Sequence, residues 1–193
     1  MRNLFYAVLS VIFLCPLSIA GEKDDVEKLL KSRIDAVISF LQNKELKGEE
    51  KEKKITEIII PMFDFSVMAK LSLGKKHWPG LSGKEKMEFK NHFVKRMKAS
   101  YLEKMNLYTD EKIVYKAPVK IRNKIHIPTH LISKGDKISM LYKLYKAKSG
   151  WKIYDIEIQG VSIIRTYRTQ FDQVMSKGTF NDLLLELKKL GNK

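Results

Sequence analysis

The stretch WKIYDIEIQGVSIIRTYRTQF, residues 151–171, decides the fold because its pattern changes from that of a strand to that of a helix. Residues 151–158 are typical of a β-strand, which we expect to be the last one in the chain. From residue 162 onward the apolar side chains recur at helical spacing; they are Ile164, Tyr167 and Phe171. We therefore expect a sheet that ends here and passes into a helix.

The segment before this stretch alternates apolar and polar residues, which indicates further strands. Turn residues at 134–136 and 148–150 divide it into short units. Because these connections are too short for parallel crossovers, the sheet should be antiparallel. The alternating positions are Ile113, Tyr115, Val119, Ile121, Ile125, Ile127, Thr129, Leu131, Ile138, Met140, Tyr142 and Leu144.

Three helices are predicted near the N-terminus. Apolar residues recur at helical spacing over residues 24–43. A second, short helix should end before Pro61, since the residue before a proline avoids the helical conformation. Asp64 is expected to cap a third helix, which should close at Gly74.

The clearest local helix signal begins at Ser82 and Glu85, which have the spacing of a capping box. Behind them one apolar stripe runs along a helix of about twenty residues; its members are Phe89, Phe93, Met97, Tyr101 and Met105. A final helix should begin near Thr179. The order of helices, strands and helices predicts an α+β fold: helices packed on one face of a curved antiparallel sheet of about four strands, enclosing an apolar cleft.

The first twenty residues have the pattern of a cleavable secretory signal. A basic start at Arg2 is followed by an apolar run from Leu4 to Leu14 and by small residues before a cleavage site after Ala20. The run is shorter than the roughly 20 apolar residues of a membrane span. A lipoprotein signal would acylate Cys15, but the residue before it is a large leucine. We predict residues 1–20 as a signal peptide, residues 21–193 as one domain, and export to the periplasm.

The charge of the chain is strongly positive, +15 overall and +14 once Arg2 has left with the predicted signal. Most of the positive charge is lysine, whereas bidentate phosphate recognition favours arginine. This balance argues against a specific nucleic-acid reader. It leaves two interpretations open: solvated lysine-rich faces, or attraction to anionic membrane surfaces and acidic partners.

Catalytic and metal-binding patterns are weak. His126 and His130 are four residues apart, but in a strand that separation spans roughly 13 Å, so shared ligation of a metal is not expected. Asp155 and Glu157 lie on one face of the last strand and could serve as acid and base; the alternative is an edge or capping role. We predict no cofactor, no metal and no catalytic residue.

The 151–171 stretch resembles the signature of the MlaC family, the periplasmic phospholipid-binding component of the Mla system, also called the toluene-tolerance auxiliary family. A second segment agrees with the family, from Phe63-Asp64-Phe65 through Leu73-Gly74 to Trp78. So does the helix that carries Phe89, Phe93 and Tyr101. The resemblance spans the chain after the signal in consistent order, although the lysine content departs from the family.

The resemblance implies a monomeric carrier that moves phospholipid between outer and inner membranes. Its implied partners are an inner-membrane ABC transporter with an MCE-domain ring and an outer-membrane lipoprotein–porin complex. Methionines beside large rings also suit a cavity for variable alkyl chains, although any core has this composition. The residues predicted to contact the tails are Phe65, Met68, Leu71, Phe89, Phe93, Met97, Tyr101, Met140, Tyr142, Val161, Ile164, Tyr167 and Phe171.

Arg168 has two possible roles at the border of the last apolar helix face. Its guanidinium could bind a lipid phosphate, or it could brace the helix against the sheet through an acidic residue such as Asp155 or Glu157. Three alternatives to the phospholipid carrier also remain open at this point. They are a carrier of another lipid such as a hopanoid, a pocket enzyme using Asp155 or Glu157 as base with Tyr154 or Tyr167 as donor, and a structural adaptor with a solid core.

Overall fold

A computed structural model of the chain describes the backbone of residues 18–46, 48–105 and 111–191, and the side chains of 21–46, 48–100 and 111–189. The predicted signal peptide therefore lies almost wholly outside the described residues and stays a prediction. Two long helices lead the chain, α1 (Ser18–Gln42) and α2 (Gly48–Ile59). The second ends before the short helix η1 (Ile60–Met62), which contains Pro61 at its start.

Helix α3 (Phe65–His77) begins as predicted at Asp64, whose side chain accepts a hydrogen bond from the N–H of Val67 at 2.9 Å. At Gly74 the backbone turns out of the helical conformation with a φ of 68°, a value that favours glycine. The predicted stop at Gly74 is thus a sharp change of direction. The chain continues through η2 (Trp78–Gly80).

Helix α4 (Gly83–Met105) begins with the predicted capping box. The carboxylate of Glu85 accepts from the N–H of Ser82 at 2.7 Å, and the hydroxyl of Ser82 accepts from the N–H of Glu85 at 3.3 Å. These two bonds satisfy backbone donors that would otherwise have no partner in the first turn.

The sheet has six strands, all antiparallel, in the order β1-β3-β4-β5-β6, with β2 also paired to β3. The strands are β1 (Lys112–Tyr115), β2 (Val119–Ile121), β3 (Lys124–Ser133), β4 (Asp136–Ala147), β5 (Gly150–Ile158) and β6 (Val161–Ser162). About four strands were predicted; β2 matches the predicted alternating pair Val119 and Ile121, whereas β6 has only two residues, which is too short for a periodic pattern.

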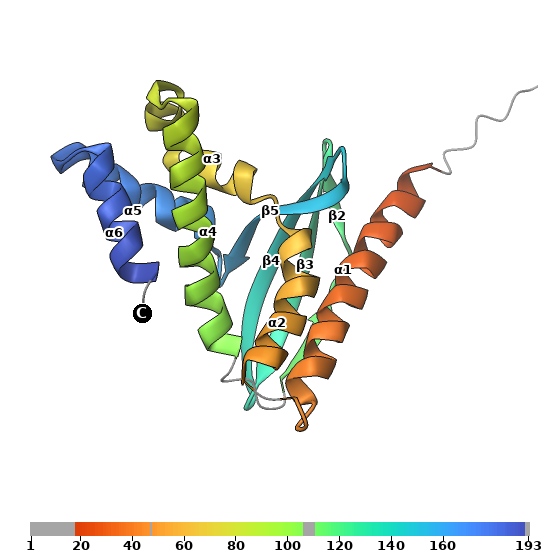
Figure 1. The fold of residues 1–193 in the computed structure, drawn as a ribbon. Helices are drawn as coiled ribbons and strands as arrows, with labels where there is room; N and C mark the ends of the chain where they lie inside the picture. Colours follow the sequence, from red (N-terminus) through yellow and green to blue (C-terminus); the bar gives the residue numbers. More distant parts are fainter. Residues whose placement is uncertain (1–17, 47, 106–110, 192–193) are drawn as a thin grey trace, which may run out of the picture.

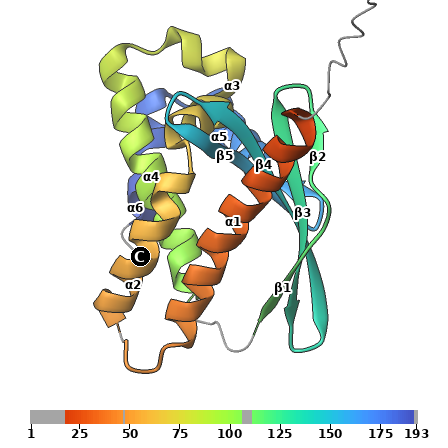
Figure 2. The ribbon, with the colours of Figure 1, turned by 90° about the vertical axis from the view of Figure 1, so that its right-hand side faces the viewer.

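Helices cover one face of this sheet, as the sequence predicted (Figures 1 and 2). α1 and α2 lie in front of β3 and β4, and α2 lies between α1 and α4 (Figure 1). The last two helices, α5 (Ile163–Lys177) and α6 (Phe180–Gly191), pack against α3 and α4 beyond the last strands. The α+β class and the antiparallel sheet are confirmed.

Alternation along the strands separates two faces of the sheet. On β3 the side chains of Ile125, Ile127 and Thr129 are buried toward the helices, whereas His126 and His130 face the other way. Between β4 and β5 the register shifts at Lys143 and Leu144, within β4, which marks a bulge. Such a bulge bends the strand and increases its twist locally.

Candidate functional site: an apolar pocket between sheet and helices

A pocket of about 420 Å³ lies between the helix-facing side of the sheet and the helices. This volume falls within the roughly 300–1,000 Å³ of small-molecule sites. Its lining is almost entirely apolar, and the side chains come from α1, α2, η1, α3, α4, four strands and the start of α5. The apolar members are Leu30, Ile34, Val37, Ile38, Leu41, Ile59, Ile60, Met62, Phe63, Phe65, Met68, Met97, Ile113, Leu131, Met140, Ile153, Ile156, Ile158 and Ile163.

Helix α1 supplies one side of this main pocket. Its lining residues recur every three or four positions, so they share one face of the helix. Leu30 and Val37 on that face are buried, whereas Ile34, Ile38 and Leu41 are only half-buried. An apolar helix face that remains half-buried beside a cavity is free to contact an apolar ligand.

Four polar side chains complete the lining: Arg33, Lys98, Glu111 and Tyr142. Tyr142 is buried on β4, and its hydroxyl donates weakly to the sulfur of Met140 at 4.0 Å. Burial raises the pKa of Tyr142 to about 12, so the phenol is neutral at physiological pH. The interior of the main pocket therefore carries no charge from this tyrosine.

Five of the residues predicted to contact lipid tails line the main pocket: Phe65, Met68, Met97, Met140 and Tyr142. They come from α3, α4 and β4, so the fold brings them together from separate parts of the sequence. Tyr101 lies on α4, but its side chain is outside the described part of the structure.

Four of the other predicted residues lie in a second apolar region, which we call the aromatic core: Phe89, Phe93, Tyr167 and Phe171, joined by Phe180, which was not predicted. Their rings pack against one another with centroid separations of 5.4 to 6.4 Å. Phe89 and Phe93 have no exposed surface. These rings contact one another and so fill the space between α4, α5 and α6.

Three predicted residues have other surroundings. Ile164 is buried in α5 and Leu71 is half-buried in α3, and neither lines the main pocket. Val161 is 60% exposed and, with Tyr167, lines a second, more polar pocket of about 290 Å³. The remaining members of this second pocket are Arg96, Ser100, Ile158, Ile163, Thr166 and Gln170.

The sequence-based list did not include the contributions of α1, η1 and β5 to the main pocket. A usable signal was present in the run of residues 58–63, which is more apolar than one face of a short helix requires. Half-buried positions such as Ile34 and Ile38 carry no such signal, because helical periodicity does not separate a packed face from one that borders a cavity.

Arg168 lies outside the main pocket and braces two helices. Its guanidinium donates two hydrogen bonds to the backbone carbonyl of Leu71 on α3, the one from Nε at 2.9 Å. The side chain also lies against Gly74, where a Cβ would come within 3.3 Å of Nε. The predicted brace thus exists with a different partner: it joins α5 to α3, and the expectation of a salt bridge to Asp155 or Glu157 is wrong.

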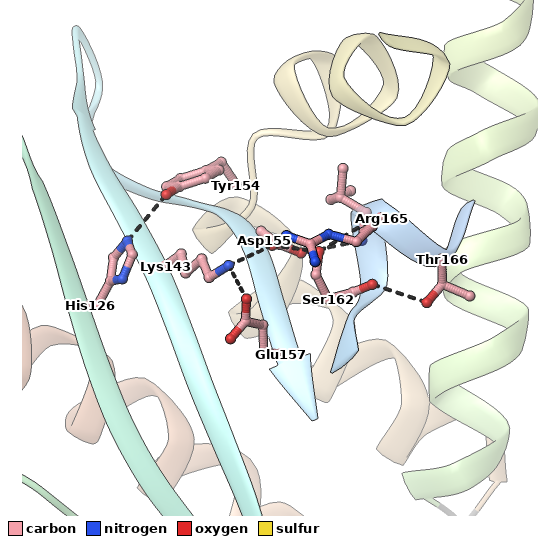
Figure 3. A network of polar contacts seen from close by, with 9 residues as sticks. His126, Lys143, Tyr154, Asp155, Glu157, Ser162, Arg165 and Thr166 are labelled. Carbon is pink, nitrogen blue, oxygen red and sulfur yellow. Dashed lines mark hydrogen bonds and ion pairs between the residues drawn. The ribbon is translucent and has the colours of Figure 1, made fainter. Parts of the chain in front are cut away.

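Asp155 forms the centre of a polar network where β5, β6 and α5 meet (Figure 3). Its carboxylate accepts from the hydroxyl of Ser162 at 2.7 Å and from the N–H of Ile164 at 3.2 Å. Ser162 is the N-cap of α5, and its hydroxyl accepts from the N–H of Arg165 at 3.1 Å. Asp155 therefore completes the capping of α5, the structural role that the sequence left open beside catalysis.

Lys143 on β4 bridges the two carboxylates of β5 on the face opposite the helices (Figure 3). Its ammonium lies 3.1 Å from Asp155 and also donates to Glu157. Burial opposes the charge, but hydrogen bonds to both carboxylates raise the pKa of Lys143 above its ordinary value. Nearby, His126 and the hydroxyl of Tyr154 are 3.2 Å apart. These side chains face away from the main pocket.

Across residues 18–46, 48–105 and 111–191 no group of three or more His, Cys, Asp or Glu side chains could hold a metal ion. Over the same ranges, no helix is both long enough and apolar enough to span a membrane. His130 lies near the hydroxyl of Ser139, at 3.4 Å, on the same sheet face as His126.

Fold and pocket together define a class of protein: an α+β domain whose helices cover one face of an antiparallel sheet and border an apolar pocket. The sequence matches the family described as MlaC protein over residues 31–189. The chain therefore belongs to the MlaC family, and the resemblance found in residues 151–171 is confirmed.

The solved structures that are similar to this chain include that of the phospholipid-binding protein from Ralstonia solanacearum, in complex with a phospholipid. The two proteins are 21% identical and superpose with a TM-score of 0.76, covering 85% of this chain and 95% of the other. This similarity shows a shared fold. No curated protein matches the sequence.

Proposed function

We propose that this protein is a soluble periplasmic carrier that binds phospholipid with its tails in the main pocket. The observation that carries the proposal is an apolar pocket of about 420 Å³ in a chain of the MlaC family. The solved structure of similar fold is a phospholipid-binding protein in complex with its lipid. Export of residues 21–193 after cleavage at Ala20 belongs to the same proposal.

The physical need for such a carrier follows from the cost of exposing alkyl chains to water, about 0.8 kcal/mol per CH₂. Two chains of roughly sixteen carbons would cost on the order of 25 kcal/mol by the same figure. Free diffusion of a phospholipid between two membranes is therefore negligible. A carrier that encloses the tails and leaves the headgroup near solvent removes most of that cost.

The tail contacts proposed here are the apolar residues of the main pocket. They include Phe65, Met68, Met97 and Met140 from the sequence prediction, and the faces of α1, η1 and β5 that it omitted. The aromatic core contributes rigidity to the helices around the pocket. Its rings already make close contacts with each other, so they are not assigned to the ligand.

The carrier would exchange lipid with membrane complexes on both sides of the periplasm. We propose an inner-membrane MCE-domain ABC transporter and an outer-membrane lipoprotein–porin complex as its partners, because the chain belongs to the MlaC family. The positive charge of the chain favours approach to anionic surfaces. Lipid transfer in this scheme makes or breaks no covalent bond and uses no cofactor.

The test is direct identification of the ligand. Protein exported to the periplasm is purified without detergent, extracted with organic solvent and analysed by mass spectrometry. A phospholipid at one or more molecules per protein is the expected result, and a hopanoid in its place would change the ligand but keep the carrier. Clean extracts combined with no uptake from phospholipid vesicles would overturn the proposal. The N-terminus of the exported protein should be Gly21.

A further inference from the structure

The main pocket has a charged margin that sequence reasoning did not identify. Arg33 on α1 and Lys98 on α4 both line it, and Glu111 is the one acidic residue among its lining side chains. Arg33 is exposed and Lys98 is half-buried, so these side chains mark where the apolar lining reaches solvent. The two cations come from the helices on either side of α2 (Figure 1).

Neither cation has an ion-pair partner within the described part of the chain, unlike other basic residues near the sheet. Lys143 is held by two carboxylates, and Lys120 and Lys146 by Glu22 on α1. The carboxylate of Glu111 accepts a hydrogen bond from the hydroxyl of Ser133 at 3.0 Å. Arg33 and Lys98 therefore place two positive charges beside an apolar cavity without an ion pair among the described residues, and Glu111 is the single carboxylate in the same lining.

We propose that Arg33 and Lys98 bind the phosphodiester of the lipid whose tails fill the main pocket. This inference rests on the proposed function and adds the chemical group that the pocket selects. A guanidinium can bind two phosphate oxygens at once, and an ammonium adds a point charge from the opposite helix. The site recognises the phosphate shared by all glycerophospholipids, so it discriminates phospholipids from uncharged two-chain lipids and tolerates different headgroup alcohols.

In this proposal Arg33 and Lys98 contact the headgroup, and Arg168 does not. That side chain donates to the carbonyl of Leu71 and does not line the main pocket. Arg96, another candidate cation, lines the second pocket, which shares Ile158 and Ile163 with the main one. Arg96 therefore serves as a comparison in the experiment.

The experiment measures lipid choice at constant tails. Delipidated protein is offered equal amounts of dioleoylphosphatidylglycerol and dioleoylglycerol in non-ionic detergent, and the bound ratio is measured by mass spectrometry. The wild type should be enriched in the phospholipid. In the double variant Arg33→Gln with Lys98→Gln, the bound ratio of phospholipid to dioleoylglycerol should fall about fivefold, a modest change because exposed charge contacts are individually weak. The variant should still bind as much dioleoylglycerol as the wild type.

Matched variants separate the site from general charge. Lys28→Gln with Lys95→Gln removes the same charge from exposed positions of α1 and α4 that do not line the main pocket, and should keep the enrichment. The double variant Arg33→Lys with Lys98→Arg preserves both charges and should keep most of the enrichment in phospholipid. Inorganic phosphate in excess should not release the lipid, because phosphate has no tails to bind the cavity.

The outcomes distinguish the two proposals. A wild type that takes up neither lipid would overturn the carrier function and this inference with it. A wild type that binds both lipids equally, or a double variant that keeps the enrichment, would overturn the phosphate site and leave the carrier intact. Loss of enrichment in Arg96→Gln alone would place the phosphate in the second pocket and likewise reject the assignment.

Discussion

The two apolar regions of this molecule both exclude water, but the side chains of one fill their space and those of the other border a cavity. In the aromatic core, rings from α4, α5 and α6 contact each other. The centroid of the Phe93 ring, for example, lies 5.4 Å from that of Tyr167 and 6.3 Å from that of Phe171. In the main pocket, aliphatic and methionine side chains from α1 and the sheet border about 420 Å³ of space. The difference shows that apolar character alone does not identify a binding site. Substitutions in the two regions should therefore have different consequences.

The largest effect is expected from Phe93→Ala in the aromatic core. The ring is fully buried, so its removal should lower the free energy of unfolding by about 3–5 kcal/mol, as for other buried phenylalanines. Urea unfolding measures this loss. Met87→Ala, on the same helix but 63% exposed, should change stability by less than about 0.5 kcal/mol. If Phe93→Ala remained fully stable and lost its lipid, this ring would belong to the ligand site.

Asp155→Asn should be the next most damaging change, although Asp155 lies in neither apolar region. The carboxylate accepts from Ser162, the N–H of Ile164 and Lys143, and the neutral amide cannot replace all three contacts. We expect a loss of about 2–3 kcal/mol by urea unfolding. The half-buried Glu157→Gln is the milder control. Folded Asp155→Asn protein should carry as much lipid as the wild type; an empty but stable variant would contradict a purely structural role.

Arg168→Ala tests the brace between α5 and α3. Losing two charge-assisted hydrogen bonds to the carbonyl of Leu71 should cost about 2 kcal/mol, with a lower melting temperature as the measurement. Arg168→Lys should recover part of this stability, because one donor can still reach the carbonyl. Lipid content should stay constant in both variants. A stable Arg168→Ala protein that loses lipid would instead restore Arg168 as a headgroup contact.

Filling the main pocket should separate lipid content from stability. Ile34→Trp places a large ring on the half-buried face of α1 that lines the pocket. Extractable lipid should fall about tenfold, equivalent to 1.4 kcal/mol of binding free energy, while the melting temperature changes little. Leu29→Trp, on the same helix but outside the pocket, is the matched control. Full lipid content in a folded Ile34→Trp variant would contradict tail binding here.

The smallest effect is expected on the sheet face opposite the pocket. Burial, with the positive charge of Lys143 next, lowers the pKa of His126. The unfolded chain therefore takes up a proton near pH 6.5 before the folded protein does, and stability should fall as the pH falls through that range. His126→Gln should reduce the change in stability between pH 7.5 and pH 5 by less than about 1 kcal/mol.

A matched variant checks the cause of this pH dependence. Tyr154→Phe removes the hydroxyl that contacts His126 but keeps the imidazole, so the pH dependence should remain. Lipid content should be the same in both variants, because this face lies away from the pocket. An unchanged pH profile in His126→Gln would show that other groups titrate in this range.

Local signals predicted the ends of the helices well. Asp64, the pair Ser82 and Glu85, and Gly74 act through contacts within a few residues or through backbone conformation alone. The strand-to-helix change in residues 151–171 also depends on local periodicity, and it correctly placed β5 before α5; the expectation that β5 is the last strand is wrong, because β6 lies between them. Short strands such as β6 were not predicted separately, because two residues carry no period.

The sequence by itself therefore determined the α+β class, the antiparallel sheet, the helix caps and membership of the MlaC family. Only the tertiary structure decided that Phe93 packs against other rings while Met97, one turn later on α4, borders the main pocket. It also decided that Arg168 binds the carbonyl of Leu71 and that Arg33 and Lys98 both line one cavity. The reason is physical: periodicity reports which face of a helix avoids water, whereas filling or leaving a cavity depends on the shapes of side chains that come from distant parts of the chain.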